Sequence, residues 1–125
     1  MNENILSKKS YAFALRIIKL YQFMVDERRE FVLSKQVLRS GTSIGANIEE
    51  SVHAQSKIDF IHKLSIGQKE ACETNYWIRL LKDSGYLDEE LAGSLLRDCE
   101  EIQRLLTASI KTAKSNLKKA AMNQM

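Results

Sequence analysis

The sequence predicts an all-α protein, built as an antiparallel up-down-up-down four-helix bundle in a single domain that covers residues 1–125. The chain contains no proline and only five glycines, so it has few residues that break helices or form tight turns. Hydrophobic residues make up 44% and charged residues 28%, which is typical of a folded globular protein. Apolar residues recur at helical spacing in four segments separated by short breaks, and short connections make consecutive helices antiparallel.

The first predicted helix extends from about residue 7 to residue 28 and carries two apolar seams. The main seam consists of Phe13, Ile17, Leu20 and Met24. The second seam, beside it, consists of Tyr11, Ala14, Ile18, Tyr21 and Val25. Together they fill an arc of about 180°, whereas a bundle helix needs only one stripe. We therefore expect Tyr11, Ile18 and Tyr21 to contact another copy of the chain.

The second predicted helix begins at Ser34, a favourable N-cap residue, and ends near Ala54. Its seam consists of Val37, Gly41, Ile44, Ile48 and Val52. Gly41 and Gly45 should each weaken a solvated helix by about 0.8–1 kcal/mol relative to alanine. Close approach of a neighbouring helix is the physical reason that we expect for both glycines.

The third predicted helix begins at Ser56, whose partner in a capping box is Asp59, and it ends near Ser84 before Gly85. Its seam consists of Phe60, Leu64, Gly67, Ala71, Ile78 and Leu81. Three further apolar residues lie off this seam and are also expected to contact another copy: Ile66, Trp77 and Leu80.

The fourth predicted helix begins after the N-cap residue Asp88 and continues to about Lys119, beyond which we expect a frayed basic end. Its seam consists of Leu91, Leu95, Cys99, Ile102, Leu106, Ala113 and Leu117.

Two carboxylate-x-x-His spacings have the form of a metal-binding pattern in four-helix bundles: Glu50 with His53, and Asp59 with His62. On a helical projection all four side chains fall away from the seams of their helices. We therefore interpret them as solvated residues at helix ends and expect neither a metal nor a cofactor.

The sequence also predicts that the protein is not an enzyme. It contains no Gly-x-Ser-x-Gly elbow and no phosphate-binding loop, and the run from Ser40 to Ser43 falls within a helix. Cys72 and Cys99 are interpreted as buried small hydrophobic residues. Two unpaired cysteines and no visible signal peptide favour the reducing cytoplasm. Arg16 and Lys19 interrupt the apolar stretch of the first helix, so we expect no membrane span.

One charged pattern is more specific. Arg97, Arg104, Lys111 and Lys118 recur every seven residues, and Lys114 lies beside them on the same helix face. We expect Glu100 and Glu101 to neutralise part of the charge in the first half of this stripe, through pairing three and four residues apart. No acidic residue follows Glu101. The stripe is either a solvated helix face or a binding surface for a polyanion such as RNA or DNA.

The segment from Gln36 to Glu50 resembles the signature of the 23S rRNA intervening-sequence protein family, a family of small bacterial four-helix bundles. Its most specific part is Ser43-Ile44 with Asn47-Ile48, and the resemblance continues through Asp59-Phe60 and Tyr76-Trp77. The resemblance implies a homo-oligomer, commonly a pentamer, without catalytic residues. Related accessory proteins of diversity-generating retroelements contact nucleic acid and a reverse transcriptase.

Two functions stay open on the sequence alone. The first is a non-enzymatic oligomer that binds RNA or DNA weakly and without sequence preference through Arg97, Arg104, Lys111, Lys114 and Lys118. The second is a scaffold for another protein, such as a reverse transcriptase, in which the basic stripe has no role. Binding to RNA that weakens with salt would distinguish the two.

Overall fold

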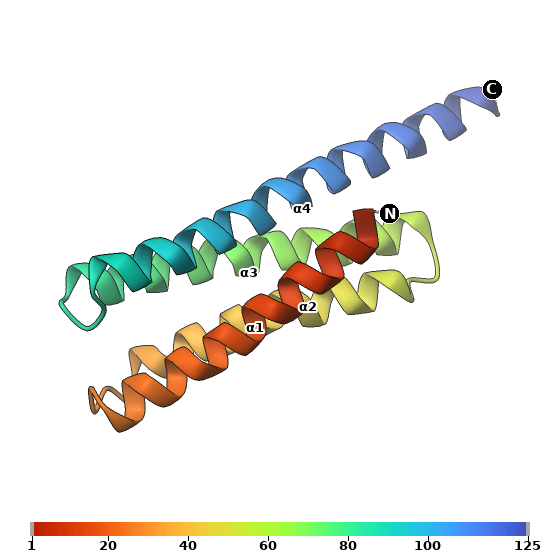
Figure 1. Cartoon of the computed structure of the whole chain (residues 1–125). Helices are drawn as coiled ribbons and strands as arrows, with labels where there is room; N and C mark the ends of the chain where they lie inside the picture. The colour runs from red at the N-terminus through yellow and green to blue at the C-terminus, as the bar shows by residue number, and fades with distance from the viewer. Residues whose placement is uncertain (1, 125) are drawn as a thin grey trace.

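The computed structural model describes residues 2–124 of the chain, and the side chains of residues 5–124. Within this part the elements are four α-helices: α1 (Asn2–Asp26), α2 (Leu33–Val52), α3 (Lys57–Asp83) and α4 (Glu89–Asn123). Each helix packs against the next one, α4 also contacts α1, and consecutive helices are antiparallel (Figure 1). The predicted four-helix bundle is confirmed. α4 stays helical past residue 119, where the sequence predicts fraying, as far as Asn123.

Three of the predicted helix boundaries rest on the expected residues. The side chain of Ser56 accepts a hydrogen bond from the backbone N–H of Asp59 at 3.0 Å. The carboxylate of Asp88 accepts one from the N–H of Leu91 at 2.7 Å. Gly85 ends the α3 region with a φ of 87°, a left-handed conformation that glycine adopts without strain.

The predicted N-cap of α2 is wrong. Ser34 lies inside the helix and is buried, and its hydroxyl donates to the backbone oxygen of Glu30. The carboxylate of Glu30 does the capping instead, because it accepts the backbone N–H groups of Val32, Leu33 and Ser34. Burial opposes the charge on Glu30, but the three N–H donors outweigh it and lower the pKa of this carboxyl below its ordinary value.

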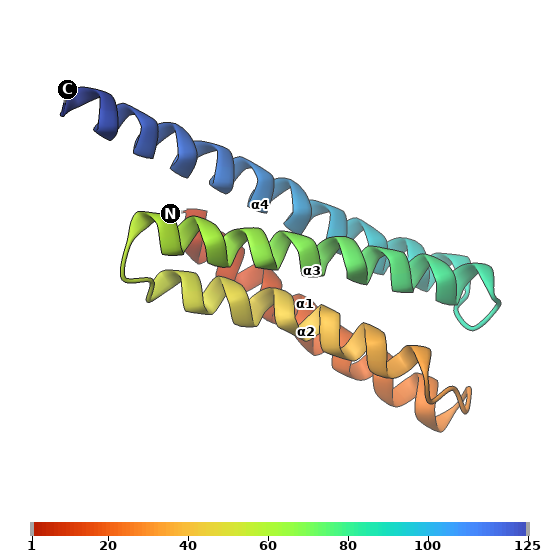
Figure 2. The same cartoon turned by 180° about the vertical axis from the view of Figure 1, so that it is seen from behind.

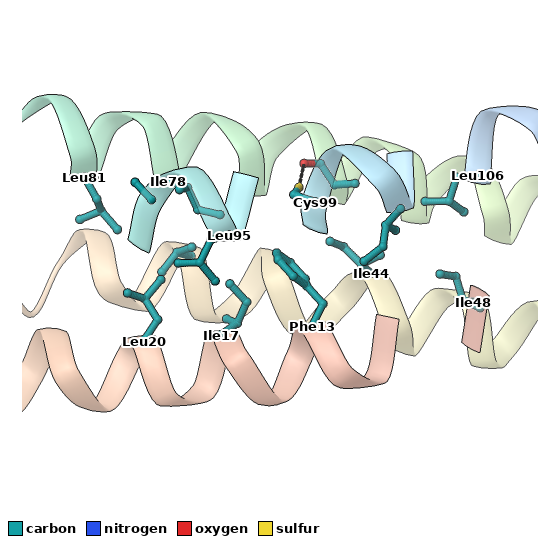
Figure 3. Packing of buried hydrophobic residues seen from close by; sticks show 14 of the residues in the cluster. Phe13, Ile17, Leu20, Ile44, Ile48, Ile78, Leu81, Leu95, Cys99 and Leu106 are labelled. Atoms are coloured by element: carbon teal, nitrogen blue, oxygen red, sulfur yellow. Dashed lines mark hydrogen bonds between the residues drawn. The ribbon is translucent and has the colours of Figure 1, made fainter. Parts of the chain in front are cut away.

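The core runs along the middle of the bundle and receives one apolar seam from each helix (Figure 3). The seams of α1 and α3 are inside as predicted, with Phe60 partly buried at the end. Val52 differs from the prediction, because it is the last residue of α2 and its side chain is exposed. Its helix ends there, so no neighbouring turn covers it.

The two glycines of α2 mark the side on which α1 lies. A Cβ placed on Gly41 would stand 2.8 Å from two branch carbons of Ile17. A Cβ on Gly45 would stand 3.4 Å from the backbone oxygen of Ser10. The expected close approach of a helix is therefore confirmed at both positions, and α1 is the helix that approaches.

The two ends of the bundle differ. At one end lie the α1–α2 turn and the α3–α4 turn, and the guanidinium of Arg28 donates to the backbone oxygens of Gly85 and Tyr86. We call this the closed end. At the other end lie the N-terminus, the α2–α3 turn and the last turns of α4, which extend beyond the other helices (Figures 1 and 2). We call this the open end. Ala113 and Leu117, predicted to lie in the core, are only partly buried there.

Candidate nucleic-acid interface

The five basic residues predicted to bind nucleic acid are all exposed on α4. They are Arg97, Arg104, Lys111, Lys114 and Lys118. Among residues 5–124, none of them forms an ion pair or a side-chain hydrogen bond with another residue. Seven residues of helix rise about 10 Å, so the stripe presents a charge at each such step along the outer face of α4. We call this surface the basic stripe.

The acidic residues of α4 do not neutralise this stripe as the sequence predicts. Glu101 accepts a hydrogen bond from Lys9 of α1 at 3.2 Å, and Asp98 accepts one from Arg16 of α1 at 2.7 Å. Glu100 has no ion-pair partner within the part of the chain described. The predicted pairing within α4 is therefore wrong for Glu101. The physical reason is tertiary: α1 brings the cations Lys9 and Arg16 to the side of α4 that faces it, and they engage Glu101 and Asp98.

The residues predicted to contact another copy of the chain lie on α1 and α3, two helices that are not neighbours in the bundle. Tyr11 and Ile18 of α1 are exposed, and Tyr21 is partly buried. Ile66, Trp77 and Leu80 of α3 are partly buried. Because α1 contacts α2 and α4 but not α3, these two apolar faces belong to opposite corners of the bundle.

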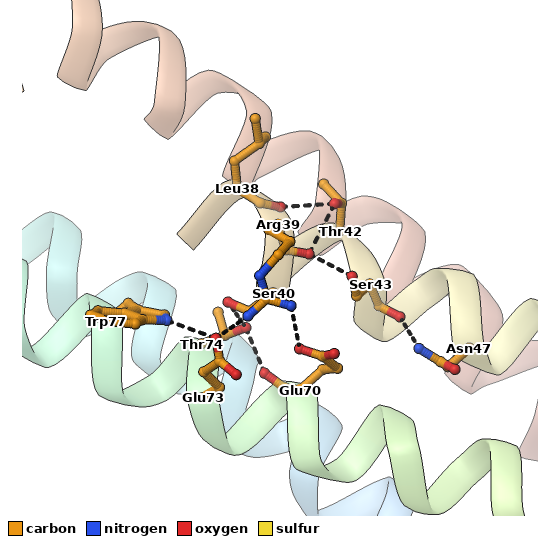
Figure 4. Close-up of polar contacts among 10 residues, drawn as sticks. All are labelled: Leu38, Arg39, Ser40, Thr42, Ser43, Asn47, Glu70, Glu73, Thr74 and Trp77. Atoms are coloured by element: carbon orange, nitrogen blue, oxygen red, sulfur yellow. Dashed lines mark hydrogen bonds and ion pairs between the residues drawn. The ribbon is translucent and has the colours of Figure 1, made fainter. Parts of the chain in front are cut away.

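A polar cluster between α2 and α3 was not predicted. Arg39 forms ion pairs with Glu70 and Glu73, and the indole N–H of Trp77 donates to Glu73 at 3.1 Å (Figure 4). The hydrogen bond from Trp77 and the nearby Arg39 hold the pKa of Glu73 below its ordinary value, although burial acts in the opposite direction. The spacing of Glu70 and Glu73 on one helix face was the available sequence signal. The cluster fixes the position of Trp77 on the outer face of α3.

The hydroxyl groups of the α2 motif are also engaged. Thr42 and Ser43 donate to the backbone oxygens of Leu38 and Arg39, at 2.8 and 2.6 Å. Ser40 is buried and accepts a hydrogen bond from Thr74 of α3 at 2.9 Å (Figure 4). This run therefore joins helices and is not arranged as a phosphate cradle.

The four residues with metal-like spacing lie near the α2–α3 turn. Glu50 accepts from Lys63 at 2.9 Å, and His53 and His62 are exposed, whereas Asp59 is partly buried. In the described part of the chain, no three His, Cys, Asp or Glu side chains are grouped closely enough to hold a metal ion.

The two cysteines differ from each other. Cys99 is buried as predicted, its thiol donates to the backbone oxygen of Ala71 at 3.3 Å, and burial raises its pKa to about 12. Cys72 is exposed, so its predicted burial is wrong. It lies on the edge of α3 beside α4, where the amide of Gln103 donates to its sulfur at 3.4 Å.

None of the helices in residues 2–124 is long and apolar enough to cross a membrane.

Comparison with known proteins places the chain in a family. The family model of the 23S rRNA-intervening sequence protein matches residues 2–108. None of the curated proteins matches the chain. Among solved structures, the chain is similar to a protein of unknown function from the S23 ribosomal protein family of Bacteroides thetaiotaomicron. The two sequences are 53% identical, the match covers 89% of this chain and 99% of the other, and the TM-score is 0.88. The chain therefore belongs to the 23S rRNA-intervening sequence protein family.

Proposed function

We propose that the protein is a non-enzymatic homo-oligomer that binds RNA or DNA through the basic stripe of α4, without reading the base sequence. The observation that carries this proposal is the exposure of five cations that have no acidic partner within residues 5–124. Phosphate binding needs positive charge in a row, and the affinity that it provides is independent of sequence. The pairing of Asp98 and Glu101 with Arg16 and Lys9 of α1 supports the proposal, because it engages two of the three acidic residues between Arg97 and Arg104.

The oligomer in this proposal is a closed ring. The apolar face with Tyr11, Ile18 and Tyr21 lies on α1, and the one with Ile66, Trp77 and Leu80 lies on α3. An interface that joins two different faces repeats from copy to copy and closes into a ring when the rotation allows it. The family resemblance implies five copies. A ring would repeat the basic stripe around its circumference and multiply its charge.

Salt dependence tests the nucleic-acid part. Binding of single-stranded RNA should weaken with a slope of log K against log salt of about −0.7 for each phosphate neutralised. The double variant Lys111→Glu/Lys118→Glu should bind more weakly and with a flatter slope. Lys19→Glu/Lys35→Glu is the matched control, because it changes the net charge equally at exposed lysines of α1 and α2. An equal loss of RNA affinity in both double variants would show that net charge alone is responsible. Absence of binding by wild type at low salt would favour the scaffold for another protein.

Mixing two variants tests the ring. Light scattering should show about five times the chain mass of 14.3 kDa for wild type. Ile18→Glu on α1 and Ile66→Glu on α3 should each prevent assembly, because each buries a charge in one of the two faces. Their mixture should form a dimer, since each variant retains the face that the other lacks. Two variants that stay monomeric when mixed would contradict an interface between different faces.

A further inference from the structure

A pocket of about 150 Å³ opens at the open end of the bundle, between α4 and the ends of the other three helices. Its floor is apolar and consists of Leu6, Ile48, Phe60 and Leu64. Three of these side chains belong to the buried core, so the floor is held by the packing of the bundle. Its wall comes from one stretch of α4, residues 109–116.

The pocket exists because the core-facing seam of α4 changes its chemistry at this point. Leu95, Ile102 and Leu106 fill the core with large apolar side chains. The following positions on the same face are Ser109, Ala113 and Asn116. These side chains are too small or too polar to fill the space above Phe60 and Leu64.

The polar side chains of this wall are not engaged with the rest of the described chain. On α2 and α3 the hydroxyls of Thr42, Ser43 and Ser65 donate to backbone oxygens of their own helices. In contrast, the side chains of Ser109, Thr112 and Asn116 form no hydrogen bond with any other residue among 5–124. They are therefore available to a molecule that enters the pocket.

We propose that this pocket binds an unpaired pyrimidine base of single-stranded RNA, an inference that rests on the nucleic-acid binding proposed above. A cavity of about 150 Å³ holds one six-membered ring such as benzene. A pyrimidine has this ring size, two faces that pack on apolar and aromatic side chains, and a polar edge. The faces meet Phe60 and Leu64, and the edge meets Ser109, Thr112 and Asn116. Unstacked bases are bound in this way in proteins that recognise single-stranded RNA.

The charge beside the pocket is suited to the same ligand. Lys119 is exposed and follows Thr112 by seven residues, so it lies on the pocket side of α4, two turns further on. A nucleotide whose base occupies the pocket carries its phosphate towards solvent, and Lys119 is the cation nearest along the helix on that side. The basic stripe binds the remainder of the strand on the outer side of α4.

A strand without bases separates the contribution of the pocket from that of the stripe. Wild type is expected to bind oligouridylate about fivefold or more tightly than an abasic strand of equal length and charge, the lower limit for one base packed on an aromatic ring. Ala113→Leu should abolish this preference, because the new side chain occupies the pocket. Ser109→Ala/Asn116→Ala should reduce it, because it keeps the room and removes the polar edge. Ala108→Leu, at an exposed position of the same helix, is the matched control and should keep it.

Titration with uridine alone provides a second readout that does not depend on the stripe. Uridine at millimolar concentration should shift the methyl resonances of Ile48 and Leu64 in wild type and in Lys111→Glu/Lys118→Glu, but not in Ala113→Leu. Equal binding of both strands by wild type, or a preference that survives Ala113→Leu, would overturn the pocket and leave the stripe intact. Uridine shifts in a protein that binds neither strand at low salt would overturn the stripe instead.

Discussion

The closed and open ends of the bundle are built from the same four helices but in opposite ways. At the closed end, Arg28 joins the two turns, and Glu30 accepts three backbone N–H groups at the start of α2. At the open end, α4 extends past its neighbours with a pocket beneath it and unpaired cations along it. Hydrogen bonds within the chain join the turns of the closed end, whereas the polar side chains of the pocket at the open end have no partner among residues 5–124.

With the function proposed above, the comparison assigns folding and binding to different parts of this small domain. Buried apolar side chains and satisfied backbone groups provide most of the stability of a domain. Side chains without partners provide none, and they retain their capacity to bind another molecule. We therefore expect substitutions to affect mainly stability at the closed end and mainly binding at the open end.

The largest effect on the free energy of unfolding is expected when one leucine at each end is replaced by alanine and the two losses are compared. Leu81 is fully buried at the end of α3, and Leu81→Ala should lower the free energy of unfolding by about 2–5 kcal/mol. Leu117 is only partly buried on the extension of α4, so Leu117→Ala should cost less than about 1 kcal/mol. Urea denaturation followed by circular dichroism measures both. Equal losses would show that the extension of α4 is packed as tightly as the core.

The next comparison concerns two glycines and predicts opposite signs. Gly41→Ala places a methyl group 2.8 Å from the branch carbons of the buried Ile17, and should destabilise the protein by about 1–2 kcal/mol. Gly93→Ala on α4 meets only the flexible side chain of Arg97, at 3.4 Å. It should stabilise the protein by up to about 1 kcal/mol through helix propensity. Stabilisation by Gly41→Ala would contradict the close contact between α1 and α2.

A smaller effect depends on pH and tests the closed end alone. The pKa of Glu30 is lowered from its ordinary value of 4.5, so its contribution to stability is present above that value. The contribution is lost as the pH falls through the lower pKa of the folded state. Glu30→Gln should therefore cost about 1 kcal/mol at pH 7 and progressively less in acid below pH 4.5. Glu27→Gln, at an exposed position after α1, is the control and should cost less stability at pH 7.

The smallest effect on stability is expected from a substitution that fills the pocket at the open end. Ala113→Leu adds apolar volume next to Phe60 and Leu64, and should raise the free energy of unfolding by about 0.5 kcal/mol or more. Ala108→Leu adds the same side chain at an exposed site and should change stability less. Calorimetric melting temperatures compare the two. A destabilised Ala113→Leu would mean that the space is smaller than the described pocket.

Much of the fold follows from local chemistry, which is why it could be predicted. The apolar spacing in Phe13, Ile17, Leu20 and Met24 defines a buried face without reference to the rest of the chain. The caps at Ser56 and Asp88 and the turn at Gly85 involve partners within a few residues. Ser34 is not the N-cap because the helix already begins at Leu33, where the carboxylate of Glu30 accepts the N–H groups of Val32, Leu33 and Ser34.

The candidate site could be predicted only in part, because helix geometry is local whereas the ion pairs between helices are not. The seven-residue spacing placed Arg97, Arg104 and Lys111 on one face, because helix geometry alone determines which residues share a face. The sequence could not show that α1 engages Asp98 and Glu101, since that pairing spans more than 80 residues of chain. The exposure of Cys72 and the partners of Arg39 also depended on where neighbouring helices pack.

By itself, the sequence determined four helices, their antiparallel order and most of the residues that face the core. The tertiary structure decided which charges stay free, how closely α1 approaches Gly41, and that a pocket opens where Ser109, Ala113 and Asn116 replace large side chains. Periodicity fixes the direction of a side chain about its own helix axis. The neighbours that it meets there depend on where each helix ends and at what distance the next one packs, and only the assembled bundle sets those quantities.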